Sequence, residues 1–260
     1  MTVNCHIVST EPGKDNPTVR NHFIIALAGN PNVGKSTVFN RLTGMKQHTG
    51  NWPGKTVIKA EGTFYHRNRR YTLVDLPGTY SLHAGSADEQ VARDFICFSR
   101  PDITLVVSDA TCLERNLNLV LQVLEITSQV VLCVNLMDEA KRKRIQVDTE
   151  KLAQELGIPV VGTAARSGQG LNRLKNVLGD MVDGKIVTSP RCVVYDQELE
   201  SLVQQIEPRL AIYMPNWVNR RWVALRLLEG EFNLLNHIPH NALMDYPRGE
   251  IKEDGALCLL

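Results

Sequence analysis

The segment 29–37, which reads GNPNVGKST, constrains the fold of this chain more than any other feature. It has a glycine, four residues, a second glycine, a lysine and a serine, and it lies between the apolar run 23–28 and the amphipathic run 38–44. A loop of this kind presents several backbone N–H groups to one anion, and the following helix adds the positive end of its dipole. The pattern therefore predicts a strand, a phosphate-binding loop and a helix, in that order.

Near-continuous apolar runs recur along the chain. They span residues 23–28, 103–110, 130–136 and 158–163. Strands that are buried on both faces of a parallel sheet have this composition. Residues 56–66 and 69–76 flank the pair Arg67-Asn68, and they predict a hairpin at the edge of the sheet.

Helical patterns lie between the predicted strands. In residues 148–157, Asp148 is expected to cap the start of a helix and Gly157 to end it. Residues 171–181 place apolar side chains on one helical face. The alternation of strands and helices predicts an α/β domain over residues 22–184, with a doubly wound, mostly parallel sheet and an antiparallel edge hairpin.

The two ends of the chain lack this alternation. Residues 1–21 contain turn-forming residues and few apolar ones, which predicts a flexible leader. Residues 195–260 predict a small all-α domain, because apolar residues recur at helical spacing and strand patterns stop. Its expected helical stretches are 196–210, 216–230 and 231–238. Because no acids, bases or metal ligands converge there, this second domain is not expected to carry catalysis.

The composition excludes several classes of protein. Hydrophobic residues make up 43% of the chain, which is enough for a core, and the net charge of +1 gives no strong field toward nucleic acid or an anionic membrane. The basic run 141–144 is expected to be a solvated helix end. No signal peptide is visible, and no apolar stretch approaches the roughly 18 residues that cross a bilayer, so a soluble chain is expected.

The six cysteines form no C-x-x-C pair, so neither metal-binding nor redox spacing is present. Cys97 and Cys133 lie in apolar runs and are expected to be small core residues. This usage of cysteine fits a reducing compartment.

A second motif, DLPG at residues 75–78, follows an expected strand about 40 residues after the phosphate loop. The carboxylate of Asp75 can hold the hydration shell of a Mg²⁺ ion, as a Walker-B aspartate does. Gly78 allows the backbone to approach a γ-phosphate and to move when that phosphate leaves. Its order after the phosphate loop makes this motif specific.

A third motif, NLMD at residues 135–138, ends an expected strand. The Asp138 carboxylate can accept two N–H bonds from the edge of a guanine ring, and adenine offers the wrong pattern, so GTP is favoured over ATP. Asn135 is expected to tie the base loop to the phosphate loop. In the segment 163–166, TAAR, the backbone N–H of Ala165 is expected to meet the guanine oxygen.

These motifs, in this order, are those of the G-protein superfamily. Three segments go further, and read GNPNVGKSTVFNRLTGMKQHTGNWPGKTV at 29–57, DLPGTYSL at 75–82 and DATCLERNLNL at 109–119. They closely resemble the GTPase domain of the bacterial ferrous-iron transporter B family (FeoB), over residues 23–184. A helical domain comes next in that family, which matches the second domain expected here.

The resemblance implies a GTP-binding region at the cytoplasmic face of the bacterial inner membrane, joined in the full-length protein to an Fe(II) permease that this chain lacks. Oligomerisation is left open, and no nucleic-acid partner is expected. Switch I corresponds to residues 46–57, with Thr56 as a Mg²⁺ ligand in the GTP state, and switch II begins at Asp75. The implied cofactors are GTP or GDP, Mg²⁺ and K⁺.

Most of the expected site residues come from the three motifs and switch I. The expected GTP-binding residues are Gly29, Asn30, Pro31, Asn32, Val33, Gly34, Lys35, Ser36, Thr37, Gly54, Lys55, Thr56, Asp75, Leu76, Pro77, Gly78, Asn135, Met137, Asp138, Ala164 and Ala165. The expected catalytic residues are Asn32, Lys35, Thr56 and Gly78. The expected Mg²⁺ ligands are Ser36, Thr56 and, through a water, Asp75.

The K⁺ hypothesis depends on Asn32. Its amide oxygen is neutral, and it suits a large, weakly hydrated monovalent cation beside the phosphates. FeoB-like domains are similar to other asparagine-bearing GTPases in using K⁺ there, with the carbonyls of Gly50 and Trp52 closing the shell. Pro31 restricts the loop backbone and favours a pre-formed loop. The alternative is that Asn32 only stabilises the loop through a backbone hydrogen bond.

Three residues depart from the family pattern. Lys55 stands where a hydrophobic residue is common, Ala164 stands in place of the base-loop serine, and Cys112 stands in place of an asparagine. None of these changes removes a phosphate-binding group.

Slow hydrolysis is expected, because Thr79 occupies the position at which many GTPases carry a glutamine that orients the attacking water. Asp88 and Glu89 could contact a water, although a solvated helix start is the simpler role for both. No arginine finger can be assigned, because the arginines near the hairpin most simply cap it: Arg67, Arg69 and Arg70.

Two other functions stay open at this point. A GTPase that acts on RNA or ribosomes shares the N-P-N-x-G-K-S loop, but it calls for a basic or aromatic-rich accessory domain. Residues 195–260 contain Trp217, Trp222 and arginines, and acids balance these charges. A nucleotide-binding scaffold without turnover is the other alternative, and multiple-turnover phosphate release would distinguish it.

Overall fold

The computed structural model describes residues 20–44, 47–53, 55–83, 85–232 and 234, and these contain a sheet of seven strands. The strands are β1 His22–Gly29, β2 Gln47–Asn51, β3 Ile58–His66, β4 Arg69–Asp75, β5 Ile103–Asp109, β6 Val130–Asn135 and β7 Val160–Gly162. Their order across the sheet is β2-β3-β4-β1-β5-β6-β7. Strands β4, β1, β5, β6 and β7 are parallel, while β3 runs antiparallel to β4 and β2 to β3. The predicted fold, a mostly parallel sheet with an antiparallel edge hairpin, is confirmed.

Strand β2 was not predicted. Its sequence, QHTGN, is polar and contains a glycine, so it has no alternating apolar signal. It pairs with β3 from Gln47 opposite Gly62 to Asn51 opposite Ile58, at the edge of the sheet. The segment expected to be switch I therefore begins as an edge strand. Backbone pairing, rather than side-chain burial, defines it.

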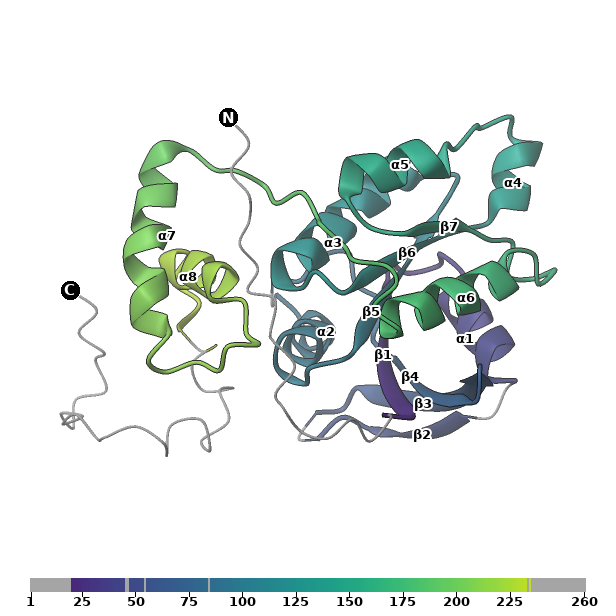
Figure 1. Cartoon of the computed structure of the whole chain (residues 1–260), viewed down its shortest axis with the longest axis horizontal. Coiled ribbons are helices and arrows are strands. Elements are labelled where there is room, and N and C mark those ends of the chain that lie inside the picture. The colour runs from purple at the N-terminus through teal and green to yellow at the C-terminus, as the bar shows by residue number, and fades with distance from the viewer. Residues whose placement is uncertain (1–19, 45–46, 54, 84, 233, 235–260) are drawn as a thin grey trace. The chain divides into compact units, whose positions relative to one another are not determined.

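Within the described residues, five helices lie between the strands of the sheet and a sixth follows β7. They are α1 Lys35–Thr43, α2 Ala87–Phe98, α3 Leu113–Ile126, α4 Met137–Arg142, α5 Thr149–Leu156 and α6 Leu171–Val182. Helices α1 and α6 cover one face of the sheet, while α2 and α3 cover the other (Figure 1). The Asp148 side chain accepts hydrogen bonds from the backbone N–H groups of Glu150 and Lys151, and Gly157 ends α5 with a φ of 70°. Both predicted helix ends are therefore confirmed.

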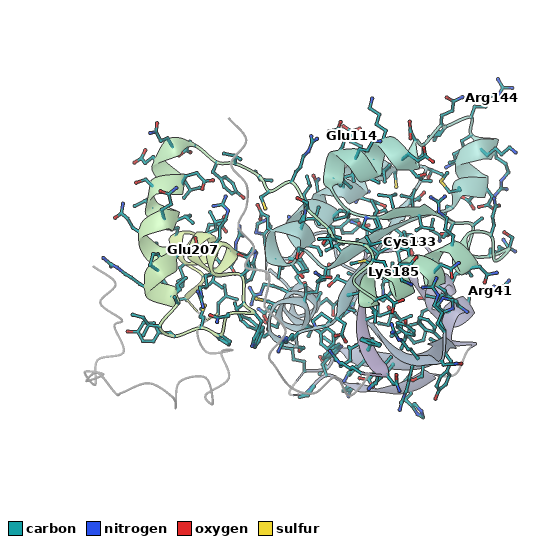
Figure 2. The ribbon with its side chains drawn as sticks, viewed as in Figure 1. Arg41, Glu114, Cys133, Arg144, Lys185 and Glu207 are labelled. Carbon is teal, nitrogen blue, oxygen red and sulfur yellow. The ribbon has the colours of Figure 1, made fainter. Side chains whose placement is uncertain are left out.

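The basic run 141–144 closes α4 and continues beyond it. Its four side chains are exposed, and Arg142 lies 3.5 Å from Glu139 on the same helix. Arg144 points away from the sheet (Figure 2). The prediction of a solvated helix end is confirmed.

The described residues from Val193 onward form a separate compact unit. It contains α7 Gln197–Leu210 and α8 Arg220–Leu228, capped by the side chains of Asp196 and Asn219. The Glu200 carboxylate joins the helices by accepting two hydrogen bonds of 2.8 Å from Arg221. Among the described residues, no helix is both long and apolar enough to cross a bilayer. Nearly all of the leader expected at 1–21, and most of the helix expected at 231–238, lie outside the described residues.

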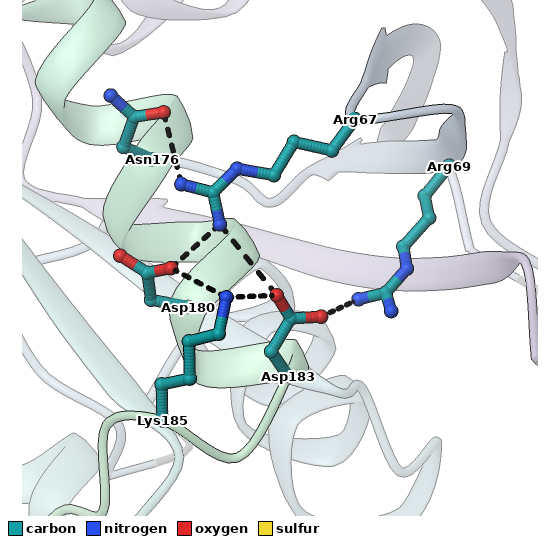
Figure 3. Close-up of polar contacts among 6 residues, drawn as sticks. All are labelled: Arg67, Arg69, Asn176, Asp180, Asp183 and Lys185. Atoms are coloured by element: carbon teal, nitrogen blue, oxygen red, sulfur yellow. Dashed lines mark hydrogen bonds and ion pairs between the residues drawn. The ribbon is translucent and has the colours of Figure 1, made fainter.

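A cluster of charges, which we call the hairpin clasp, ties the β3–β4 turn to the end of α6 (Figure 3). Its members are Arg67, Arg69, Asp180, Asp183 and Lys185. Arg67 donates to Asp180 at 2.6 Å, Arg69 pairs with Asp183, and Lys185 donates to Asp183 at 3.1 Å. The hydrogen bond from Arg67 lowers the pKa of Asp180, and that from Lys185 lowers the pKa of Asp183. Arg67 and Arg69 thus hold the hairpin against α6, at the opposite end of β4 from Asp75.

Candidate functional site

Both glycines of the phosphate loop are required by close packing. A Cβ on Gly29 would lie 2.6 Å from the backbone oxygen of Val107 on β5. A Cβ on Gly34 would lie 2.4 Å from Nδ2 of Asn135, and the φ of Gly34 is +81°, a conformation that favours glycine. The loop can therefore run against β5 and β6 and turn directly into α1. No side chain caps the start of α1, whose first N–H groups face the loop.

Lys35 joins the phosphate loop to the DLPG motif. Its Nζ pairs with the Asp75 carboxylate and donates to the Leu76 carbonyl at 2.6 Å. The strands that end in these motifs are neighbours, because Leu27 lies opposite Asp75 in the β1–β4 register. Burial raises the pKa of Asp75, and the Lys35 ammonium opposes that shift. A phosphate placed in the loop would compete with Asp75 and Leu76 for the lysine.

The start of the predicted switch II rests on the phosphate loop. The Thr79 N–H donates to the Gly29 carbonyl at 3.3 Å, and a Cβ on Gly78 would lie 3.5 Å from Pro31. The Thr79 side chain is 5% exposed, so it is turned into the protein rather than toward a ligand. In this arrangement Thr79 cannot replace the water-orienting glutamine of other GTPases.

Glu89 and Asp88 lie in the first turn of α2, where Ser86 caps the helix. The Glu89 carboxylate accepts hydrogen bonds from the Ser81 hydroxyl at 2.7 Å and the Gly85 N–H at 2.9 Å. Glu89 therefore braces the loop before α2, and Asp88 is exposed at the helix start. The expected role of a solvated helix start fits Asp88, whereas the half-buried Glu89 carboxylate is held by the preceding loop.

Asn135 connects three segments in the buried part of the site. Its Nδ2 donates to the Val33 carbonyl of the phosphate loop at 3.0 Å. Its Oδ1 accepts from the Ala165 N–H at 3.0 Å and from the Thr163 hydroxyl at 3.1 Å. Thr163 was not among the expected site residues, although it begins the TAAR segment. The loops for phosphate and for base are thus held together by one side chain.

Two further contacts shape the base loop. The Met137 N–H donates to the Thr163 carbonyl at 3.0 Å, and Arg41 of α1 donates to the Arg166 carbonyl. Leu136 has a φ of 62°, which turns the chain sharply from β6 into α4. Asp138 follows that turn and is exposed, 3.9 Å from Arg142. Its carboxylate is accessible to a ligand. A guanine oxygen would share the Ala165 N–H with Asn135.

The predicted switch I lies against β3 and α2. Trp52 packs edge-on against Phe95, with 5.3 Å between ring centroids, and the Trp52 carbonyl accepts the Lys55 N–H at 3.0 Å. Lys55, one of the departures from the family pattern, donates to the Gln90 side chain at 3.1 Å. Gly50 pairs with Lys59 in the ladder. Among the described residues, no hydrogen bond links 50–57 to the phosphate loop, and Gly54 lies outside those residues.

Ser36 and Thr56 have exposed hydroxyls and Asp75 has a carboxylate, and oxygen donors of these kinds fit Mg²⁺. Asn32 is exposed and has a backbone φ of 65°, and the neutral oxygen of its side-chain amide fits a monovalent cation. The structure brings Asp75 to the phosphate loop through Lys35. It does not bring Thr56, Gly50 or Trp52 there.

The buried cysteines are packing residues, and Cys133 Sγ lies 3.2 Å from the Thr163 hydroxyl behind Asn135. Cys133 lies within β6 (Figure 2), and burial raises the pKa of its thiol to about 12. Burial also raises the pKa of Cys97, so neither forms a thiolate near neutral pH. Both are core residues, as predicted. Burial and Asp109 raise the pKa of the exposed Cys112, which argues against a reactive thiol.

The phosphate loop follows β1, DLPG begins at the end of β4, and NLMD begins at the end of β6. This arrangement defines a P-loop GTPase fold, and a helical unit follows it in the chain. The family model described as ferrous iron transport protein B matches residues 23–178, and that of the FeoB cytosolic helical domain matches residues 195–254. The chain therefore belongs to the ferrous iron transport protein B family.

Curated relatives and solved structures support this assignment. The Fe(2+) transporter FeoB of Salmonella typhimurium is 40% identical over 211 residues, which cover 80% of this chain and 27% of the relative. A Fe(2+) transport protein A/FeoB fusion protein of Porphyromonas gingivalis is 39% identical over 213 residues, covering 80% of this chain and 25% of the fusion. The chain thus spans about a quarter of the length of these relatives.

The cytosolic domain of T. maritima FeoB, solved in a GDP form, has a TM-score of 0.76 and 36% identity, and the match covers 90% of this chain and 89% of that one. A GMPPNP form of the same domain has a TM-score of 0.75, with 36% identity and 89% of each chain covered. The cytosolic domain of L. pneumophila FeoB has a TM-score of 0.72 and 32% identity, covering 84% of this chain and 93% of that one.

Proposed function

We propose that this chain binds GTP and hydrolyses it slowly to GDP and phosphate, as the regulatory G domain of a bacterial Fe(II) uptake transporter. The observation that carries the proposal is the convergence of Lys35, Asp75 and Asn135, from three loops, at one end of the sheet. The T. maritima relatives solved in GDP and GMPPNP forms support the same ligand class.

The phosphate loop would bind the nucleotide through its backbone N–H groups, and Lys35 would exchange Asp75 and Leu76 for the β and γ phosphates. Ser36, Thr56 and Asp75 would hold Mg²⁺, with Asp75 acting through a water. When bound, Mg²⁺ neutralises charge on the phosphate oxygens. Thr56 is exposed and outside the β2–β3 pairing, so it can move toward the loop.

Asp138 would select guanine, because its exposed carboxylate can accept both N–H groups on that edge of the base. Met137, Ala164 and Ala165 would line the base loop beside it. Asn135 would position the loops rather than contact the base, since its side chain already hydrogen-bonds Val33, Thr163 and Ala165.

Hydrolysis would be slow, because Thr79 is buried and no arginine is directed to the phosphates by the contacts that the structure gives. We propose that K⁺ assists, held by Asn32 with the carbonyls of Gly50 and Trp52. Bound K⁺ supplies positive charge beside the phosphates, where an arginine finger acts in other GTPases. Switch I would have to approach the loop to complete this shell.

The test is multiple-turnover phosphate release from GTP in potassium and in sodium buffer. We expect faster release in potassium, and Asn32→Ala should remove the difference while leaving GDP affinity nearly unchanged. Asn172→Ala, at an exposed site on α6, is the matched control. Equal rates in the two salts would contradict the role of K⁺, and no turnover in either salt would indicate a binding scaffold.

The named relatives are Fe(2+) transporters about four times the length of this match, which supports a permease in the same full-length protein as the partner. We therefore place the domain at the cytoplasmic face of the bacterial inner membrane, with oligomerisation there as a further proposal. In the full-length transporter, Lys35→Ala should abolish the GTP dependence of Fe(II) uptake. Uptake that keeps its GTP dependence in this variant would contradict the regulatory role.

A further inference from the structure

The side chain of Asn30, inside the phosphate loop, is a buried amide without a hydrogen bond. It is 2% exposed, and neither Oδ1 nor Nδ2 has a partner among the residues that the structure describes. Buried amides are nearly always paired, because desolvation without a partner is costly. Its neighbour Asn32, by contrast, is exposed. The two asparagines of the loop therefore need separate explanations.

The position of Asn30 follows from the pleat of β1. Phe23, Ile25 and Leu27 pack in the core with α1 and α6. Alternate residues of β1 point to the opposite face, which α2 and α3 cover, and Asn30 is buried directly after the end of the strand. Helix α2, which follows switch II in the chain, lies on this face.

Switch II already touches both residues that flank Asn30. The Thr79 N–H donates to the Gly29 carbonyl, and Gly78 lies against Pro31. Gly78 can change its backbone conformation freely because it lacks a side chain. Peptide groups of residues 78–80 therefore follow directly on contacts with both neighbours of Asn30, which makes them candidate partners for its amide.

Nucleotide binding would change this loop. The Leu76 carbonyl and the Asp75 carboxylate are both held by Lys35. A phosphate that takes over the lysine leaves the residues after β4 with fewer restraints. A buried amide with free donors and a free acceptor can then stabilise one new conformation of the loop.

We propose that Asn30 is a positioning residue for GTP hydrolysis. Its side-chain amide hydrogen-bonds the peptide groups of residues 78–80 once a γ-phosphate has drawn switch II toward the phosphate loop. It thereby holds Thr79 and its neighbours in the conformation that hydrolysis requires. This inference rests on the proposed GTPase function. It adds a role for Asn30 that the phosphate-loop pattern does not require.

The experiment compares Asn30→Ala and the similarly sized Asn30→Leu with the parent chain. Losing two neutral hydrogen bonds made only in the reacting conformation should lower kcat roughly 10- to 50-fold. KM for GTP and Kd for GDP should stay within about twofold, because these bonds are absent from the ground state. Asn30→Leu should unfold at no lower urea concentration than the parent, since it buries no unpaired amide.

Hydrogen exchange of the peptide 78–82 provides a readout that does not depend on turnover. The parent should exchange more slowly there with GMPPNP than with GDP, and both Asn30 variants should lose that difference. Thr104→Val is the matched control: Thr104 is a buried, unpartnered hydroxyl on the same face of β5, distant from switch II along the strand. It should keep the kcat and the protection of the parent.

Parent-like kcat and protection in the Asn30 variants would overturn the inference. An equal loss of kcat and protection in Ser108→Ala would also overturn it. Ser108 is another buried group on β5 without a partner among the described residues. A core water shared by Ser108 and Asn30 would then explain both effects. If the parent chain binds GMPPNP and its residues 78–82 are protected, but it does not hydrolyse GTP, only the proposed enzyme activity is refuted. Absence of protection in the parent would refute the role of Asn30.

Discussion

Replacing Asn135 by alanine should strongly destabilise the fold. The side chain is 1% exposed, and its removal leaves the Val33 carbonyl and the Ala165 N–H without this partner and the Thr163 hydroxyl with Cys133 Sγ alone. An unpaired buried group costs about 1–3 kcal/mol, although the three are coupled and water can enter the gap. We expect a loss of about 2–5 kcal/mol in the free energy of unfolding.

The assay is urea unfolding followed by far-UV circular dichroism, with and without saturating GDP. Asn172→Ala, on the exposed face of α6, should change the free energy by less than about 0.5 kcal/mol. In Asn135→Ala the affinity for GDP should also fall, because the phosphate and base loops are no longer tied together. A destabilisation below about 1 kcal/mol would mean that the three hydrogen bonds are replaced by other partners. The reasoning from Asn135 would then be refuted.

Three further outcomes follow from the same structure. Asp138→Ala should weaken GTP binding by about 1–3 kcal/mol and allow ATP to bind. Because the carboxylate is exposed, urea unfolding should be unchanged. A variant that still selects GTP over ATP as the parent does would disprove the role assigned to Asp138. The pKa values of Asp180 and Asp183 are lowered from 3.8. The hairpin clasp should therefore stabilise the fold above that pH, and this contribution should be lost as the pH falls through the lowered pKa values. Acid unfolding monitored between about pH 5 and 2 should therefore flatten when both aspartates are changed to asparagine, and an unchanged profile would contradict the assignment. A 1–190 fragment should still bind and hydrolyse GTP, as measured by phosphate release, and complete loss of turnover in a folded fragment would assign catalysis to the helical unit.

Local chemistry explains why so much of the fold could be predicted. The phosphate loop needs glycine where the backbone approaches β5 and β6, and those glycines are visible in the pattern. The buried parallel strands have long apolar runs, and the ends of α5 carry capping residues. Each of these signals lies within a few consecutive residues, so the sequence alone determined the buried strands, the ends of α5 and the order of the nucleotide motifs.

The tertiary structure decided what depends on partners distant in the chain. The polar strand β2 exists because β3 pairs with it, and Lys55 acquires a role because Gln90 lies within reach. The two asparagines of the phosphate loop look alike in the sequence, yet Asn32 is exposed and Asn30 is buried. Burial depends on which face of β1 the helices α2 and α3 cover, and only the folded chain sets that arrangement.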